Sequence, residues 1–151
     1  MMTLSDPNAA MGDLSPLIRD AAAGNLEAQR SGRSMALAAM HNAAEEGNYV
    51  IGQGHAMEAM FWARFAASHG HVDDAIILAA VLTSLAKYWG YDQEGATWGN
   101  QWLAEAVALL DRLAGEGCAA AATAVNEISL MVAPRIFAQA KQVKEFVDAG
   151  C

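Results

Sequence analysis

Apolar runs alternate along this chain with short polar breaks, and most of the breaks contain glycine. The clearest case is the stretch 56–80, AMEAMFWARFAASHGHVDDAIILAA, in which one apolar run ends at Gly70 and a second begins after residues 71–74. A long apolar run that stops at glycine and restarts behind polar residues is typical of two helices joined by a tight turn. This stretch therefore predicts a helical hairpin.

The same signals divide the rest of the chain into about six to seven helices. Ser15 and Pro16 favour a helix start, because serine is a good N-cap and proline fits the first helical position. The helix ends are expected at glycines, which adopt the left-handed conformation easily. The predicted helices cover residues 15–23, 25–46, a segment that starts between 49 and 56 and ends at 70, then 72–89, 98–114, 118–132 and a terminal segment after residue 134.

Two positions complicate this assignment. Pro134 either starts a last helix or kinks a continuous one, and the kink is favoured because no Gly, Asn or Asp stands beside it to make a turn. Gly32 lies inside the second helix and weakens it by about 1 kcal/mol relative to alanine, so a local loosening is expected there. Residues 1–14 are polar and rich in small residues, which predicts a flexible lead-in before a single domain over residues 15–149.

The composition restricts the fold class. Hydrophobic residues make up 54% of the 151 positions, many of them alanine, whereas only 7% are aromatic. Alanine has the highest helix propensity, and a chain of this length can bury one sizeable core. We therefore predict an all-α protein of stacked antiparallel helical hairpins, as a short α-solenoid or a compact helical bundle.

The charge balance limits the partners. Nine Lys and Arg against seventeen Asp and Glu give a formal net charge of -8, which is the opposite of the basic face that nucleic-acid binding needs. No apolar run approaches the length of a membrane span without charges, and the N-terminus lacks the pattern of a signal peptide. We expect a cytoplasmic protein whose Cys118 and Cys151 are reduced, with no contact to membrane or nucleic acid.

Three helix ends are alike and predict an internal repeat. They are AAAGNLEAQ around Gly24, AASHGHVDDA around Gly70 and LAGEGCAAA around Gly117, and they are 46 and 47 positions apart. A nearly constant period in this range is typical of stacked helix pairs, none of which buries its apolar side alone.

The repeated unit resembles the Sel1-like repeats, a helical family similar to the tetratricopeptide repeats, in a degenerate form. The residues that carry the resemblance are Ala59-x-x-Trp62-x-x-x-Ala66-Ala67-x-x-Gly70 for the second helix, Ala22-Ala23-Gly24-Asn25-x-Glu27-Ala28-Gln29 for the turn and the next first helix, Leu85-x-x-Tyr88-x-Gly90 for a first-helix end, and Gly52-x-Gly54 for a loop. The resemblance covers residues 22–117, with a period about ten residues longer than is usual for that family. It implies an α-solenoid-like stack used for protein–protein contact, and it brings no catalytic residues.

His69, His71, Asp73 and Asp74 are the candidates for a metal site. Imidazole and carboxylate groups suit a borderline divalent metal, and these four residues are close together in the chain. The turn at Gly70 is expected to point neighbouring side chains apart, and aspartates in a first helical turn interact favourably with the helix dipole. We therefore predict turn and cap roles for all four, and no metal or other cofactor.

No catalytic set is apparent in the sequence. Cys118 follows a glycine at a helix start, where a thiol pKa can be lowered, but no base stands beside it in the chain. The nucleophile-elbow, P-loop, HExxH and dinucleotide-binding motifs are missing from the sequence. We predict that the protein is not an enzyme.

An aromatic set flanks the predicted turn over residues 90–95 and contains three of the four tryptophans. Tyr and Trp combine a large apolar surface with a polar tip, which suits contact hot spots. Large aromatic residues also fill cores and join helix ends, so both interpretations are open. The residues we nominate for partner binding are Tyr88, Trp89, Tyr91, Trp98 and Trp102.

Three functional hypotheses follow from the sequence. The first is a non-catalytic module, a scaffold or adaptor, that binds a protein or peptide or a second copy of itself, because its third and fourth helices are apolar almost all round and need cover. The second is a helical bundle that binds a small molecule or metal in a pocket near Tyr88, Trp98, Trp102 and His69. The third is an acidic inhibitor of a basic partner, which requires strongly salt-dependent binding.

Overall fold

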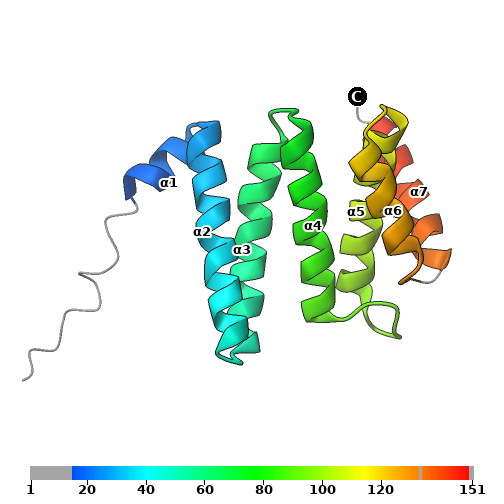
Figure 1. Cartoon of the computed structure of the whole chain (residues 1–151), viewed down its shortest axis with the longest axis horizontal. Coiled ribbons are helices and arrows are strands. Elements are labelled where there is room, and N and C mark those ends of the chain that lie inside the picture. Colours follow the sequence, from blue (N-terminus) through cyan, green and yellow to red (C-terminus); the bar gives the residue numbers. More distant parts are fainter. Residues whose placement is uncertain (1–14, 133, 150–151) are drawn as a thin grey trace, which may run out of the picture.

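The computed structural model describes residues 15–132 and 134–149 and confirms the all-α class (Figure 1). The described part of the chain contains seven helices and no strand. The helices are α1 (Ser15–Ala22), α2 (Leu26–Glu45), α3 (Tyr49–Ala67), α4 (Val72–Trp89), α5 (Thr97–Gly115), α6 (Ala119–Ser129) and α7 (Pro134–Ala149). The predicted flexible lead-in, residues 1–14, lies outside the described residues.

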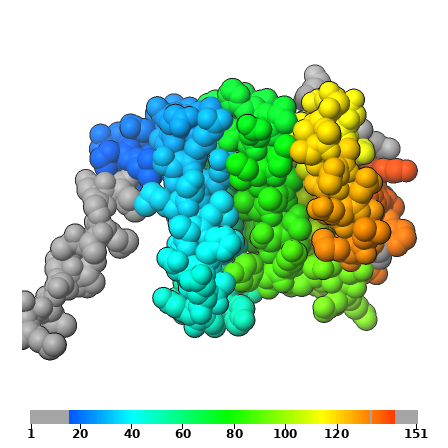
Figure 2. Space-filling model, in the orientation of Figure 1, coloured from blue at the N-terminus to red at the C-terminus, as the bar shows by residue number. Residues whose placement is uncertain are grey.

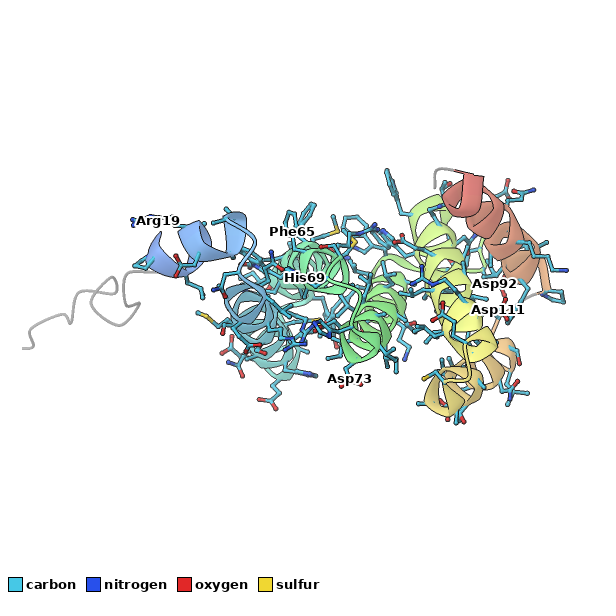
Figure 3. All side chains as sticks on the ribbon, turned by 90° about the horizontal axis from the view of Figure 1, so that it is seen from above. Arg19, Phe65, His69, Asp73, Asp92 and Asp111 are labelled. Atoms are coloured by element: carbon cyan, nitrogen blue, oxygen red, sulfur yellow. The ribbon has the colours of Figure 1, made fainter. Side chains whose placement is uncertain are left out.

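From α2 onward, the helices form stacked antiparallel pairs in two layers. The chain reverses direction at each turn, so that α2, α4 and α6 lie in one layer and α3, α5 and α7 in the other (Figures 1 and 3). Each helix from α1 to α5 packs against the next one in the chain, and α5 also contacts both α6 and α7. Because α5 touches three other helices, it is the central element of the C-terminal half.

The turns at Gly24, Gly70 and Gly117 have the same geometry. Their φ angles are 93°, 85° and 95°, in the left-handed region that glycine adopts without strain. In all three cases the following residue is an N-cap with extended backbone and starts the next helix. The chain therefore ends one helix and begins the next in the same way at these three turns, which are 46 and 47 residues apart.

α6 and α7 are separate helices, so the predicted kink at Pro134 is wrong. The last turn of α6 closes with backbone hydrogen bonds from Leu130 N to Glu127 O and from Met131 N to Ile128 O. Pro134 occupies the first position of α7, where its missing N–H is not needed. The preference of proline for the start of a helix over its interior therefore outweighs the lack of turn-forming residues.

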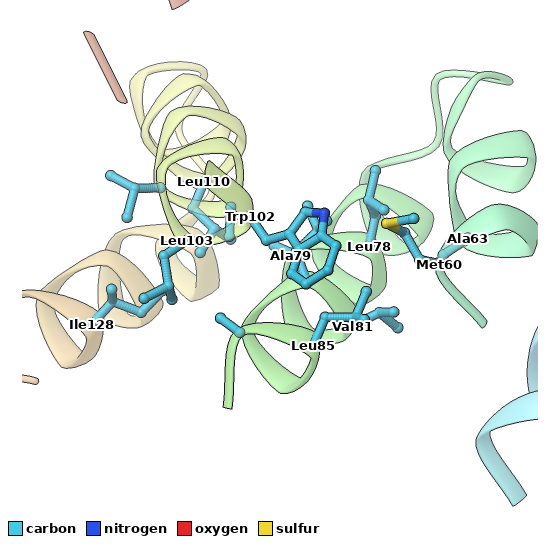
Figure 4. Packing of buried hydrophobic residues seen from close by; sticks show 14 of the residues in the cluster. Met60, Ala63, Leu78, Ala79, Val81, Leu85, Trp102, Leu103, Leu110 and Ile128 are labelled. Atoms are coloured by element: carbon cyan, nitrogen blue, oxygen red, sulfur yellow. The ribbon is translucent and has the colours of Figure 1, made fainter. Parts of the chain in front are cut away.

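The core combines alanines with larger aliphatic side chains, and Figure 4 shows part of this packing. Ala56, Ala59, Ala63 and Ala66 of α3 are fully buried, which lets α3 approach its neighbours closely. The predicted apolar side of α5 is buried as well. Its residues are Leu103, Ala106, Leu110 and Leu113.

Gly32 is a packing residue and not a point of loosening in α2. The helix is continuous through it, and a Cβ atom at this position would lie 2.9 Å from the indole Cδ2 of Trp62. The missing side chain lets the tryptophan of α3 lie directly on the backbone of α2. The expected loosening is therefore absent from α2, and close α2–α3 contact offsets the low helix propensity of glycine.

α3 is less enclosed than its almost uniformly apolar sequence predicts. Phe61 and Phe65 are 55% and 52% exposed on its outer side. Neither α3 nor any other helix within the described ranges combines the length and the apolarity needed to cross a bilayer. The exposed side of α3 lies on the same face of the molecule as the exposed tryptophan of α5.

Candidate interaction surface

The structure separates the five predicted partner-binding residues into two groups. Trp89, Trp98 and Trp102 form a cluster in which the ring of Trp102 lies 6.0 Å from each of the other two, centroid to centroid. Tyr88 instead packs against the backbone of α3, and Tyr91 is half-buried against the core. The three tryptophans are thus the part of the nominated set whose rings lie together.

Within this cluster, Trp102 is a core residue that supports two exposed rings. Trp102 is only 6% exposed and lies between α5 and α4 (Figure 4), whereas Trp98 and Trp89 are 67% and 48% exposed. The Trp89–Trp102 pair is edge-to-face, an arrangement that aromatic quadrupoles favour. The core interpretation therefore holds for Trp102, and the partner-binding interpretation stays a prediction for Trp89 and Trp98.

The turn between α4 and α5 fixes the two sides of the cluster relative to each other. A Cβ atom at Gly99 would lie 1.6 Å from the carbonyl oxygen of Gly90, so the first turn of α5 touches the backbone of the loop. The side-chain oxygen of Asn100 accepts a hydrogen bond of 2.6 Å from the backbone N–H of Asp92. These two contacts join the loop to α5 at the point where the tryptophans meet.

α3 extends the exposed aromatic surface beside α5. Arg64 Nη2 donates a hydrogen bond of 2.7 Å to Glu105 Oε2, which links the two helices. Phe61 and Phe65 lie within one helical turn of Arg64, and Phe65 is on the outer side of the layer in Figure 3. Trp98 and Trp102 lie two turns and one turn before Glu105 on α5. We use the name aromatic face for Phe61, Phe65, Trp89, Trp98 and Trp102 together with the Arg64–Glu105 pair.

The aromatic surface continues toward α2 through Trp62. Its ring is tilted against that of Phe65, with 6.2 Å between the centroids, and its other side rests on Gly32. Phe65 thus rests on the ring of Trp62, just as Trp89 and Trp98 rest on the ring of Trp102, and both supporting rings are packed against the protein. Such support holds exposed aromatic side chains in few conformations.

Several hollows lie elsewhere on the described part of the chain. One, about 340 Å³, lies between α4 and α6, on the layer opposite the aromatic face, and follows the boundary between those helices in Figure 2. A smaller one, about 110 Å³, lies among α5, α6 and α7. A further one, about 290 Å³, is lined by Tyr49, Lys87 and Tyr88. Of the residues nominated for a pocket, Tyr88 lines this hollow, but Trp98 and Trp102 do not. His69 follows α3 and Trp98 begins α5, so they lie at opposite ends of α4 and are not brought together.

The four metal-ligand candidates do not converge. His69 Nε2 lies 3.0 Å from Gln29 Oε1, His71 is the N-cap of α4, and Asp73 is exposed in its first turn, whereas Asp74 is buried. Over residues 15–132 and 134–149, no three His, Cys, Asp or Glu side chains are placed to hold a metal ion. Cys118 is a free, half-buried thiol at the N-cap of α6.

Asp74 is instead the centre of a buried charge cluster that the sequence did not reveal. Its side chain is 1% exposed and accepts two hydrogen bonds of 3.1 Å from Arg30 Nε, one of 2.7 Å from Arg30 Nη2 and one of 2.7 Å from Arg33 Nη1. The hydrogen bonds from Arg30, and then the one from Arg33, lower the pKa of Asp74 from its ordinary value of 3.8 to about 2. The hydrogen bonds to Asp74 and Glu27 raise the pKa of Arg30. The cluster joins α2 to α4 within one layer.

The depressed pKa of Asp74 predicts acid-dependent stability. The unfolded chain takes up this proton near pH 4 and the folded chain only near pH 2, so the contribution is complete above pH 4 and is lost as the pH falls to about 2. The expected loss is about 2 kcal/mol of the free energy of unfolding. Urea unfolding of the wild type and of Asp74→Asn between about pH 2 and about pH 4 measures this loss, as the difference between the pH dependences of their free energies of unfolding. Equal pH dependence in the two proteins would contradict the prediction.

No family model matches the chain, and no curated protein and no solved structure matches it significantly.

Proposed function

We propose that this protein is a non-catalytic interaction module, a scaffold or adaptor, that binds a protein or peptide through the aromatic face. The observation that carries the proposal is the exposure of four large aromatic side chains on neighbouring elements, Phe61 and Phe65 on α3 and Trp89 and Trp98 beside the buried ring of Trp102. Large exposed apolar patches are uncommon on proteins without partners. Aromatic residues and arginine are also the types most enriched in contact hot spots.

The way in which these side chains are held supports the proposal. They project from α3, from α5 and from the end of α4, all of which are anchored in the core. Trp98 and Trp89 rest on Trp102, and Phe65 rests on Trp62. Rings that are already ordered before binding lose less conformational entropy when a partner covers them.

The stacking of helical hairpins and the shared geometry of the turns at Gly24, Gly70 and Gly117 support the resemblance to Sel1-like repeats. Proteins of that kind act through protein–protein contact, and the proposed function agrees with this. We also propose a cytoplasmic location, which the free thiol of Cys118 favours, because disulfides are rare in reducing compartments.

The proposal predicts a specific loss of binding. The double variant Phe65→Ala, Trp98→Ala is expected to reduce partner recovery from a lysate of the native host by about tenfold or more, because it removes exposed hot-spot rings and leaves Trp102 in place. Quantitative mass spectrometry of the recovered proteins measures the change.

The matched control is Val72→Ala, Leu130→Ala, which removes exposed apolar side chains outside the aromatic face. This control is expected to recover the same partner as the wild type. If the aromatic variant retains the partner as well as the control does, the aromatic face is not the binding surface.

A further inference from the structure

We infer that the aromatic face binds a basic, arginine-bearing segment of its partner, with a guanidinium group stacked on the exposed indole of Trp98. This inference rests on the proposed function of the aromatic face and names the chemical class of its partner. It follows from the exposed indole rings, from carboxylates beside them that have no basic partner, and from the charge of the whole chain.

The ring of Trp98 offers a flat π face to a partner. It is 67% exposed and is supported by the buried ring of Trp102, with 6.0 Å between the centroids and 32° between the planes. Trp89 is 48% exposed and packs edge-to-face on the same buried ring. Cations are attracted to the negative face of an aromatic ring, and tryptophan attracts them most strongly. Two supported and exposed indoles therefore suit a cationic side chain.

Two exposed carboxylates border these rings, and neither forms an ion pair with a Lys or Arg of the described residues. Glu94 is exposed in the loop between α4 and α5, four positions before Trp98. Glu58 is 56% exposed and lies one helical turn before Phe61 on the same side of α3, where its ion-pair contact is with His55 at 3.6 Å. Both carboxylates are therefore available to a basic group of a partner.

The basic residues of this region are already paired or lie on another side of the molecule. Arg64 pairs with Glu105 at 2.7 Å, and Arg135 pairs with Asp92 of the α4–α5 loop at 2.8 Å. Lys87 lines the hollow between α4 and α6, on the layer opposite the aromatic face. The unpaired charge that borders the aromatic face is therefore negative.

The charge of the whole chain favours the same class of partner. Nine Lys and Arg stand against seventeen Asp and Glu, which gives a formal net charge of -8. Most arginines are in addition paired with acids of the same chain, namely Arg30, Arg33, Arg64, Arg112 and Arg135. Such a surface attracts a basic segment at long range and repels an acidic one.

Arginine fits this surface better than lysine does. Its guanidinium group is planar and weakly hydrated, so it stacks on an indole and can donate hydrogen bonds to a carboxylate from its edge at the same time. The ammonium group of lysine is compact and strongly hydrated, so it loses more solvation on a ring. Trp98 and Glu94 are close in the chain, and the loop that carries Glu94 is fixed on α5 by the hydrogen bond between Asp92 and Asn100. One basic segment can therefore reach both groups.

Peptide binding to the full chain tests the inference, with isothermal titration calorimetry as the measurement. The probe is an acetylated and amidated peptide of alternating arginine and glycine. Its Kd is expected to rise about tenfold between about 0.05 M and about 0.5 M salt, because salt screens the attraction. The same peptide with citrulline in place of arginine keeps the planar group without the charge, and it is expected to bind about tenfold more weakly or less. The lysine peptide is expected to bind about threefold more weakly than the arginine peptide.

Matched variants separate a contact at the aromatic face from attraction by the total charge. Trp98→Ala is expected to weaken binding of the arginine peptide about tenfold, because it removes the stacking surface and leaves the net charge unchanged. Glu94→Gln and Asp73→Asn each remove one exposed carboxylate, but Asp73 lies in the first turn of α4, at the end away from the α4–α5 loop. Glu94→Gln is expected to weaken binding about threefold, and Asp73→Asn less than about 1.5-fold. Far-UV circular dichroism checks the fold of each variant.

Several results would overturn the inference. They are a citrulline peptide that binds as tightly as the arginine peptide, binding that does not change in Trp98→Ala, and equal losses in Glu94→Gln and Asp73→Asn. An arginine peptide that does not bind, together with loss of the lysate partner in Phe65→Ala, Trp98→Ala, would refute the basic class of the partner and leave the proposed function standing. A lysate partner that this double variant retains would refute the proposed function as well.

Discussion

Replacing Asp74 with alanine is expected to lower the free energy of unfolding by about 3–5 kcal/mol. The carboxylate is 1% exposed and binds Arg30 and Arg33, and the Arg33 side chain is itself only 8% exposed. Without Asp74, the guanidinium of Arg33 stays buried with its main counter-charge removed. For a domain of this size the loss corresponds to a fall in melting temperature of about 10 °C.

Asp73→Ala is the matched control, because Asp73 is the neighbouring residue in the same first turn of α4 but is exposed. Its removal costs at most the interaction with the helix dipole, less than about 1 kcal/mol. Urea unfolding of both variants at neutral pH measures the difference. Adding Arg33→Met to Asp74→Ala is expected to recover part of the stability, since it removes the unpaired charge. Equal effects of Asp73→Ala and Asp74→Ala would show that the buried cluster contributes no stability.

Gly99→Ala is expected to destabilise the fold by about 2 kcal/mol or more, although alanine is the better helix former. The new methyl group would start 1.6 Å from the carbonyl oxygen of Gly90 and 2.7 Å from its carbonyl carbon. Both are backbone atoms, so no side-chain rotation makes room. The start of α5 must then move away from the loop, and this movement disrupts the contact between Trp89 and Trp102.

Gly54→Ala makes the same chemical change in a different environment. Gly54 lies inside α3 and has no atom within 4 Å of the place where its Cβ would be, so alanine is expected to stabilise the protein by about 0.5–1 kcal/mol. Chemical denaturation followed by tryptophan fluorescence compares the two variants. The prediction fails if both substitutions change the stability in the same direction.

The helices were predictable because their ends depend on local chemistry. The predicted bounds of α4, 72 and 89, are those observed, and Asn25 caps α2 by accepting a hydrogen bond from the N–H of Ala28, as its residue type suggests. Glycine and cap signals act within a few residues and need no knowledge of the rest of the fold. The predicted all-α stack of about six to seven helices is confirmed for the same reason.

The charge cluster was not predictable in this way. Arg30 and Asp74 are 44 positions apart and meet only because α2 and α4 share a layer and turn these sides toward each other. Asp73 and Asp74 are identical in type and adjacent in sequence, and only the rotation of α4 decides which one is buried. The spacing of Arg30 and Arg33 on one side of α2 was the only signal, and by itself it also fits a solvated surface.

The exposure of the individual aromatic residues was not predictable from the sequence either. Trp98 and Trp102 are four residues apart and project from the same side of α5, so helical spacing gives both the same expected role. Their exposures are nevertheless 67% and 6%, because Trp102 packs between α5 and α4 whereas Trp98 projects toward solvent. Phe61 and Phe65 belong to a helix that is apolar almost all round, so nothing in its sequence marks the side on which they are exposed.

The contacts of α5 have a mechanical consequence. One side of this helix contacts α6 and α7, while Trp98, Trp102 and Glu105 project from another. A continuous helix moves as a rigid rod, so a displacement of the C-terminal helices that shifts α5 shifts these three residues with it. A change in the position of α6 and α7 is therefore expected to reposition Trp98 without any change in that residue itself.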